Sequence, residues 1–147
     1  MTMDTGAKHA ATDGAALART MYEAFGRGDV ATVLAMFDDQ IEWRQAEGHP
    51  YRPDGEPFIG PQAVVTQLFA RLAADFDGLV VQPGAITATT DGAIVQGRYS
   101  GTVKATGRRL DAQFCHVLRM RDGRVTHFQQ YLDTSTLQWA MDHTPVR

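Results

Sequence analysis

The chain has 147 residues, a formal net charge of −3, 44% hydrophobic and 21% charged residues, and a single cysteine. This length predicts one domain with a substantial core, and the weak negative charge gives no reason to expect nucleic acid or an anionic membrane as a partner. The lone Cys115 excludes an intrachain disulfide and a thiolate-clustered metal site, which fits a cytoplasmic protein.

The first segment, "MTMDTGAKHAATDG", lacks a hydrophobic signal region and predicts a disordered lead over residues 1–12, ahead of a single domain over residues 13–147. A first helix is expected after Asp13, because apolar residues then recur at helical spacing until Gly28. Asp29 is predicted to cap a second, short helix whose apolar side extends to Phe37.

A short strand is expected next, with Trp43 and Gln45 on its inner face. Residues 47–59 form a loop rich in proline and glycine, which we expect to act as a lid over a binding site. Pro61 then opens a third helix, in the first helical position that proline favours. Its predicted apolar stripe is Val64, Val65, Leu68, Leu72 and Phe76.

From Leu79 onward the apolar period changes from helix to strand. Strands are predicted near residues 79–90, 93–104, 109–121 and 124–132, separated by short turn sequences such as "DG". Asp133 is expected to cap a last helix over residues 134–143. Helices first and an antiparallel sheet afterwards predict an α+β domain, with helices packed on one face of a curved sheet.

His116 is the unusual residue of the third of these strands. Strand alternation places it in an inward row that is otherwise apolar: Leu110, Ala112, Phe114, Leu118 and Met120. A buried ionisable side chain needs a partner or a function. Either His116 is a core residue satisfied by Tyr99 or Gln130, or it donates a proton to, or accepts one from, a bound ligand.

Three stretches together resemble the SnoaL-like branch of the nuclear transport factor 2 superfamily: "YEAFGRGDVATVLAMFDDQIEW", the Gly-Pro helix start at residues 60–61, and "HVLRMRDGRVTHFQQYLDT". The resemblance runs from about Leu17 to Met141. It implies a cystatin-like cone, in which a curved antiparallel sheet wraps around an internal pocket roofed by helices. The superfamily hosts isomerases, cyclases, hydrolases, dehydratases and binding modules, so the fold alone does not decide the activity.

The same resemblance places the family's catalytic carboxylates at positions that are not acidic here. The general base of ketosteroid isomerase corresponds to Gln45, its protonated acid to His116, and its helix tyrosine to Met21, next to Tyr22. The aspartates of limonene epoxide hydrolase correspond to Gln130 and Tyr99, and the cyclase aspartate of SnoaL also corresponds to Gln130. Glutamine cannot exchange a proton at neutral pH, so these known mechanisms are not expected in this chain.

The predicted site keeps the family's pocket with different polar groups. His116 and Tyr99 are the candidate catalytic residues, and Tyr99 has an equally good reading as a plain core aromatic. The candidate substrate-binding residues are Trp43, Gln45, Gln130, Phe114, Phe128, Tyr22 and His49. A carboxylate from Glu47 or Asp111 near His116 would favour an enzyme over a binding protein. No metal site is predicted, because the histidines show no ligand spacing, and no cofactor is predicted.

The favoured function is a cofactor-free acid–base enzyme, of isomerase, cyclase or hydrolase type, acting on a small apolar, oxygen-bearing molecule. The alternatives are a non-catalytic small-molecule binding protein and, third, a structural homodimer with a collapsed core. We also expect a homodimer through the outer face of the sheet, whose predicted rows include Cys115, Val117, Arg119, Val125, His127, Gln129 and Tyr131.

Overall fold

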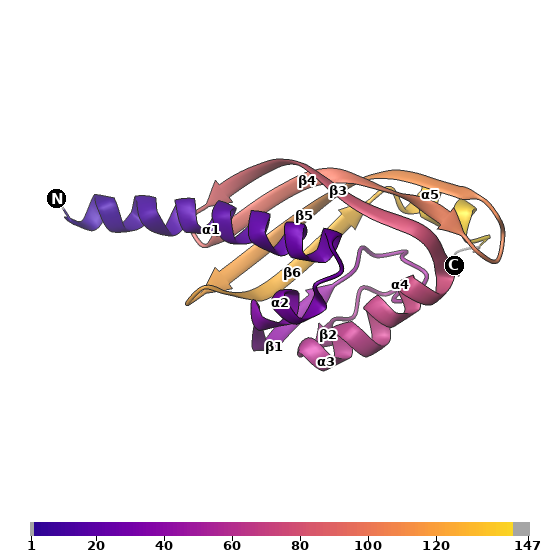
Figure 1. Ribbon diagram of the computed structural model, residues 1–147, viewed down its shortest axis with the longest axis horizontal. Helices are drawn as coiled ribbons and strands as arrows, with labels where there is room; N and C mark the ends of the chain where they lie inside the picture. The colour runs from indigo at the N-terminus through magenta and orange to yellow at the C-terminus, as the bar shows by residue number, and fades with distance from the viewer. Residues whose placement is uncertain (1, 143–147) are drawn as a thin grey trace.

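The computed structural model describes residues 2–142, with side chains described from Gly14 onward. A six-stranded sheet curves around helices that cover its concave face (Figure 1). The helices are α1 (Thr2–Gly26), α2 (Val30–Ala35), α3 (Pro61–Val64), α4 (Ala70–Asp75) and α5 (Thr134–Ala140), with a π-helical stretch, η1 (Val65–Phe69), between α3 and α4. No helix among the described residues is long and apolar enough to cross a membrane.

The strands are β1 (Phe37–Arg44), β2 (Phe58–Ile59), β3 (Phe76–Thr89), β4 (Gly92–Val103), β5 (Arg109–Arg121) and β6 (Arg124–Leu132), in the spatial order β2-β1-β6-β5-β4-β3. All neighbours pair antiparallel except β1 and β6, which pair parallel. The β3–β4 pairing shifts register twice, and such irregularities bend a strand. The predicted α+β class and curved sheet are therefore confirmed.

Helix α1 begins at Thr2, whereas the sequence predicted a disordered lead up to residue 12. The segment contains no proline and several alanines, which permits helix. Figure 1 shows this first part of α1 projecting beyond the sheet, and the domain boundary at residue 13 stays a prediction.

Two predicted helices end earlier than expected, because Phe37 and Phe76 each begin a strand instead of ending a helix. The helix caps are as predicted: the side chain of Asp29 accepts from the Thr32 amide at 3.1 Å and that of Asp133 from the Thr136 amide at 3.2 Å. His143, the predicted end of the last helix, lies outside the described residues.

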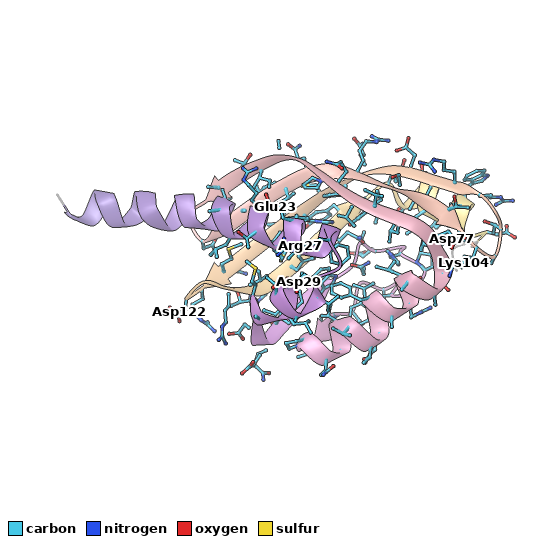
Figure 2. The ribbon with its side chains drawn as sticks, viewed as in Figure 1. Glu23, Arg27, Asp29, Asp77, Lys104 and Asp122 are labelled. Atoms are coloured by element: carbon cyan, nitrogen blue, oxygen red, sulfur yellow. The ribbon has the colours of Figure 1, made fainter. Side chains whose placement is uncertain are left out.

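The main core fills the space between the helices and the concave face of the sheet, with Leu68, Val95 and Leu118 among its buried members. Charged side chains lie at the periphery instead (Figure 2). Arg27 and Asp29 pair at 3.3 Å, and Lys104 and Asp77 at 3.9 Å, on the outside of the molecule. This separation leaves the interior of the cone free of charged side chains at the point where a cavity opens.

Candidate functional site

A cavity of about 740 Å³, its open mouth included, lies between the concave face of the sheet and helices α1, α2 and α4 with η1. Most of its lining is apolar: Met21, Phe25, Val33, Phe37, Trp43, Leu68, Phe69, Leu72, Phe76, Leu79, Val81, Leu110, Phe128, Leu132 and Leu137. The polar lining residues are Tyr22, Gln45, His49, Tyr99, His116 and Gln130.

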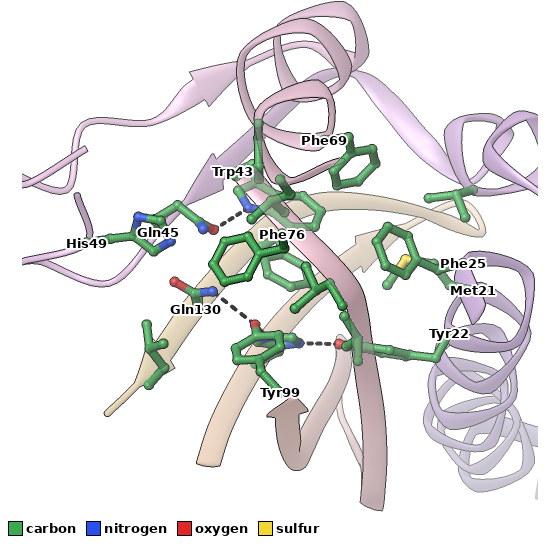
Figure 3. A pocket seen from close by; sticks show the side chains of 18 of the residues that line it. Met21, Tyr22, Phe25, Trp43, Gln45, His49, Phe69, Phe76, Tyr99 and Gln130 are labelled. Atoms are coloured by element: carbon green, nitrogen blue, oxygen red, sulfur yellow. Dashed lines mark hydrogen bonds between the residues drawn. The ribbon is translucent and has the colours of Figure 1, made fainter. Parts of the chain in front are cut away.

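His116 lies in this wall and is hydrogen-bonded to two tyrosine hydroxyls, those of Tyr22 and Tyr99, which Figure 3 labels. Its Nδ1 atom is 2.5 Å from the hydroxyl of Tyr22, which comes from the buried face of α1. Its Nε2 atom is hydrogen-bonded to the hydroxyl of Tyr99, from the neighbouring strand β4. Both ring nitrogens are therefore engaged by residues 94 and 17 positions away in sequence.

Gln130 fixes one end of this network. Its Oε1 atom must accept, because the atom opposite it at 3.1 Å is the Ala46 backbone N–H. Its amide nitrogen therefore points the other way and donates to the Tyr99 hydroxyl oxygen at 2.9 Å. The Tyr99 oxygen is an acceptor in every arrangement of the network.

The Tyr22–His116–Tyr99 network contains one hydrogen more than its internal contacts use. A neutral histidine brings one N–H and the two tyrosines bring one O–H each, while only two contacts join the three residues. Either Nδ1–H donates to Tyr22 and the Tyr22 hydroxyl hydrogen is spare, or Nε2–H donates to Tyr99 and the Tyr99 hydrogen is spare. The network thus offers one hydroxyl donor to the cavity.

Burial keeps the three residues neutral. It lowers the pKa of His116 to about 3, because the imidazolium would lose its hydration. It also raises the pKa values of the Tyr22 and Tyr99 hydroxyls well above their usual value. In the described part of the chain, every fully buried side-chain nitrogen or oxygen has a hydrogen-bond partner. The ring nitrogens of His116 are therefore both satisfied, by Tyr22 and Tyr99, whereas the sequence suggested Tyr99 or Gln130 as the partner.

Phe114 is a correction to the predicted lining. Its ring stacks on His116, with the centroids 4.0 Å apart and the planes at 10°, and it is absent from the cavity wall. Gly97 on β4 makes this position possible, because a Cβ there would come within 2.5 Å of the Phe114 ring. Phe114 thus supports the imidazole from behind, at a place that strand alternation alone could not separate from the wall.

A second pair of polar side chains, Gln45 and His49, lines the cavity beyond the end of β1. The Trp43 indole N–H donates to Gln45 Oε1 at 2.7 Å (Figure 3), so the Gln45 amide nitrogen, Nε2, is directed away from the indole N–H. The Tyr51 backbone N–H donates to His49 Nδ1 at 3.1 Å, which leaves the proton of a neutral imidazole on Nε2. Burial, and secondly the positive charge of Arg71, lowers the pKa of His49 to about 4.

Tyr51 holds the loop that carries His49. It is buried, its hydroxyl donates to the Asp75 carboxylate at 2.5 Å, and the Arg71 guanidinium lies 3.8 Å from the centre of its ring. On the other side of His49 in sequence, the Gln138 side-chain amide donates to the Gly48 carbonyl at 2.8 Å. The 47–59 loop is thus part of the cavity wall, and its closure as a lid stays a prediction.

Eight of the predicted site residues line this one cavity: Trp43, Gln45, Gln130, Phe128, Tyr22, His49, Tyr99 and His116. The two carboxylates proposed near His116 do not: Glu47 is exposed, and Asp111 pairs with Arg98 at 3.0 Å on the outer face. The apolar helix residues of the wall were not predicted as site residues. Their signal was present in the helical stripe that includes Leu68 and Leu72.

Comparison with solved structures places this cone among the nuclear transport factor 2-like proteins. One from Burkholderia thailandensis E264 is 30% identical, with 87% of this chain and 96% of that chain covered and a TM-score of 0.82. TerC, co-crystallised with polyporic acid, is 20% identical (88% and 98% covered, TM-score 0.77).

A protein with a ketosteroid isomerase-like fold from Catenulispora acidiphila DSM 44928, in complex with trimethylamine, is 15% identical (88% and 94% covered, TM-score 0.71). No curated protein matches the chain. The SnoaL-like domain family, however, matches residues 18–128, which include β1 to β5 and every polar lining residue of the cavity except Gln130. By this match the chain belongs to the SnoaL-like domain family.

Proposed function

We propose that this protein is a cofactor-free acid–base enzyme that moves a proton between two atoms of a small, mostly apolar carbonyl compound. The observation that carries the proposal is the spare hydroxyl hydrogen of the Tyr22–His116–Tyr99 network in the cavity wall. Isomerisation through an enol is the simplest reaction of this kind. It needs one group to accept a proton and one to donate a proton, both within reach of one ligand.

The network performs both tasks without forming a charged residue. In the arrangement with the spare hydrogen on Tyr22, the substrate gives a proton to the Tyr99 oxygen as Tyr99 passes its own proton to His116 Nε2. In the same concerted step the Nδ1 proton passes to the Tyr22 oxygen, and the spare Tyr22 proton passes to a second substrate atom. One proton leaves the substrate and one returns, and all three residues end neutral.

Concerted transfer is what burial favours here, because imidazolium and tyrosinate would both lack hydration in the wall. The shift leaves the spare hydrogen on Tyr99. Water in the emptied cavity restores the starting arrangement by accepting that proton and giving one to Tyr22. Gln130 keeps the Tyr99 oxygen in place throughout, as an orienting residue.

The wall supports an apolar ligand. Trp43 and Phe128 stack with ring centroids 3.6 Å apart and planes at 8°, so they form a flat aromatic surface beside the polar network. The small-molecule complexes of TerC and of the Catenulispora protein support ligand binding by cones of this kind.

Hydrogen–deuterium exchange tests the proton transfer without a known substrate. The protein is incubated in D₂O with 2-tetralone and related cyclic ketones, and NMR follows the loss of their α-hydrogens. We expect catalysed exchange, reduced by about 100-fold or more in Tyr22→Phe and in His116→Gln, in line with typical contributions of acid–base groups.

Tyr131→Phe is the matched control, because this tyrosine lies exposed on the outer face. Exchange that Tyr22→Phe leaves unchanged would rule out the relay. If the wild type binds the ketones and catalyses no exchange of their α-hydrogens, the result would favour the alternative function, a small-molecule binding protein with the same pocket. That alternative has its own support, because no carboxylate lines the cavity in the described part of the chain.

Assembly and location are also proposals. A homodimer through the outer sheet face is supported by Tyr131, which is 56% exposed on β6 beside Cys115 of β5. Val125, predicted for this face, is instead buried in the core, because an extra residue in β6 shifts its register against β5. The single, free Cys115 supports a reducing compartment such as the cytoplasm.

A further inference from the structure

The cavity presents hydrogen-bond donors and keeps its acceptors occupied. Both amide oxygens in the wall are already engaged, Gln45 Oε1 by Trp43 and Gln130 Oε1 by the Ala46 amide. Both nitrogens of His116 are engaged as well. Among the described polar lining side chains, the donors left over are therefore one tyrosine hydroxyl hydrogen, the second amide hydrogen of Gln130, the Gln45 amide hydrogens and the His49 Nε2–H.

Gln45 and His49 are each held by a group that can only donate. The Trp43 indole and the Tyr51 backbone have N–H and no acceptor at that atom, so neither Gln45 nor His49 can turn its donor away without leaving a buried N–H unpaired. Among the described residues, neither Gln45 Nε2 nor His49 Nε2 has a hydrogen-bond partner. Neither atom can be fully buried, because every fully buried side-chain nitrogen or oxygen in the described part of the chain has a partner. Both therefore open onto free space, and the cavity is the space that these residues line.

The pair is separate from the relay. Figure 3 draws Gln45 and His49 beside Trp43, with Gln130 and Tyr99 between them and Tyr22. They also depend on different supports, since Tyr51 and Asp75 hold the His49 loop while α1 carries Tyr22.

We infer that Gln45 and His49 form a second ligand subsite, which binds an acceptor oxygen other than the one that meets the relay. The substrate class is then an apolar, ring-containing compound with two acceptor oxygens, such as a diketone, in preference to compounds that must donate at that end. The inference rests on the proposed function only in placing the ligand in the same cavity.

A matched series of probes tests the subsite: 4-ethylacetophenone, with one carbonyl, and 1,3- and 1,4-diacetylbenzene, with two. Calorimetry gives the ratio of the one-carbonyl Kd to the better two-carbonyl Kd. We expect a ratio of about 10 in the wild type, as one further hydrogen bond of ordinary strength provides. Gln45→Leu and His49→Phe should each lower the ratio toward 1, and His49→Gln should keep it, because glutamine can both accept from Tyr51 and donate to the ligand.

Gln96→Leu and His127→Phe, on the outer face, are the matched controls, and thermal unfolding verifies that each variant is folded. Tyr22→Phe should reduce deuterium exchange by about 100-fold or more and leave the Kd ratio unchanged, so a failure of the relay and a failure of the subsite give different results. A wild-type ratio near 1, no detectable binding of either diacetylbenzene at millimolar concentration, or an unchanged ratio in both Gln45→Leu and His49→Phe would overturn the inference.

Discussion

On the inner face of β5, His116 is 3% exposed and hydrogen-bonded to two tyrosine hydroxyls, whereas Arg119 on the outer face is exposed and pairs with Asp91 at 3.6 Å. The inner face thus carries neutral side chains whose partners are fixed, and the outer face carries charged ones that water can solvate. The difference follows from burial, since a charge inside the cone would need a partner that the wall does not supply. It is also the basis of the proposed proton relay, since no carboxylate lines the cavity in the described part of the chain.

The largest expected difference between the two faces concerns stability. His116→Ala removes the hydrogen-bond partner of the Tyr22 hydroxyl, one of the two partners of the Tyr99 hydroxyl, and the ring on which Phe114 stacks. Loss of buried hydrogen bonds together with a cavity predicts a decrease of about 3 kcal/mol or more in the free energy of unfolding.

His127→Ala is the matched change on the outer face, where the side chain is 42% exposed and 3.4 Å from Glu42. We expect it to alter the free energy of unfolding by about 0.5 kcal/mol or less. Urea unfolding at one protein concentration measures both. Equal losses in the two variants would contradict the inner–outer distinction.

The pH dependence of stability gives the next effect. The folded-state pKa values of His116 and His49, about 3 and about 4, lie below the ordinary histidine pKa of about 6.5. At pH values between the folded-state and ordinary pKa values, the unfolded chain therefore binds more protons than the folded one. Stability is therefore full above pH 6.5 and decreases as the pH falls toward 4. Each histidine contributes about 1.4 kcal/mol per pH unit within that window.

Urea unfolding at pH 7 and pH 4.5 tests this slope in the wild type, His116→Gln and His49→Gln. Each variant should lose its own share of the slope, because glutamine does not titrate. His127→Gln is the control that keeps both buried histidines. A slope that neither replacement at 116 or 49 reduces would place the acid sensitivity elsewhere.

The sequence was sufficient for the inner and outer rows of the sheet, because a period of two is a local property of each strand. The bounds of β5 and β6 were predicted at 109–121 and 124–132, as observed. It was insufficient where the geometry departs from the ideal period, as at the β6 register shift that turns Val125 inward. The start of β3 at Phe76 was missed for another reason: a single aromatic residue suits a helix end and a strand start equally well.

The candidate site shows the same limit at longer range. Strand alternation placed Tyr99, His116 and Gln130 on one face, and the resemblance placed the family's tyrosine one residue from Tyr22. The contact of Tyr22 with His116 joins residues 94 positions apart, and neither spacing nor propensity encodes it. The partner that fixes the Gln130 amide is a backbone N–H of residue 46, which leaves no signal in side-chain identities.

The smallest expected effect on the fold comes from the outer face. Arg119→Glu combined with Tyr131→Glu changes two exposed side chains, so we expect the free energy of unfolding of the monomer to change by about 0.5 kcal/mol or less, including the added repulsion from Asp91. The same change should dissociate the proposed homodimer, because a two-fold interface would bury each new carboxylate near its symmetry copy. Sedimentation at micromolar concentration compares the two proteins. A monomeric wild type would refute the dimer, and a variant that still dimerises would place the interface on another face. A folded, monomeric variant of a dimeric wild type would support the contrast between the two faces: the neutral inner face stabilises the fold, and the outer face forms the dimer interface.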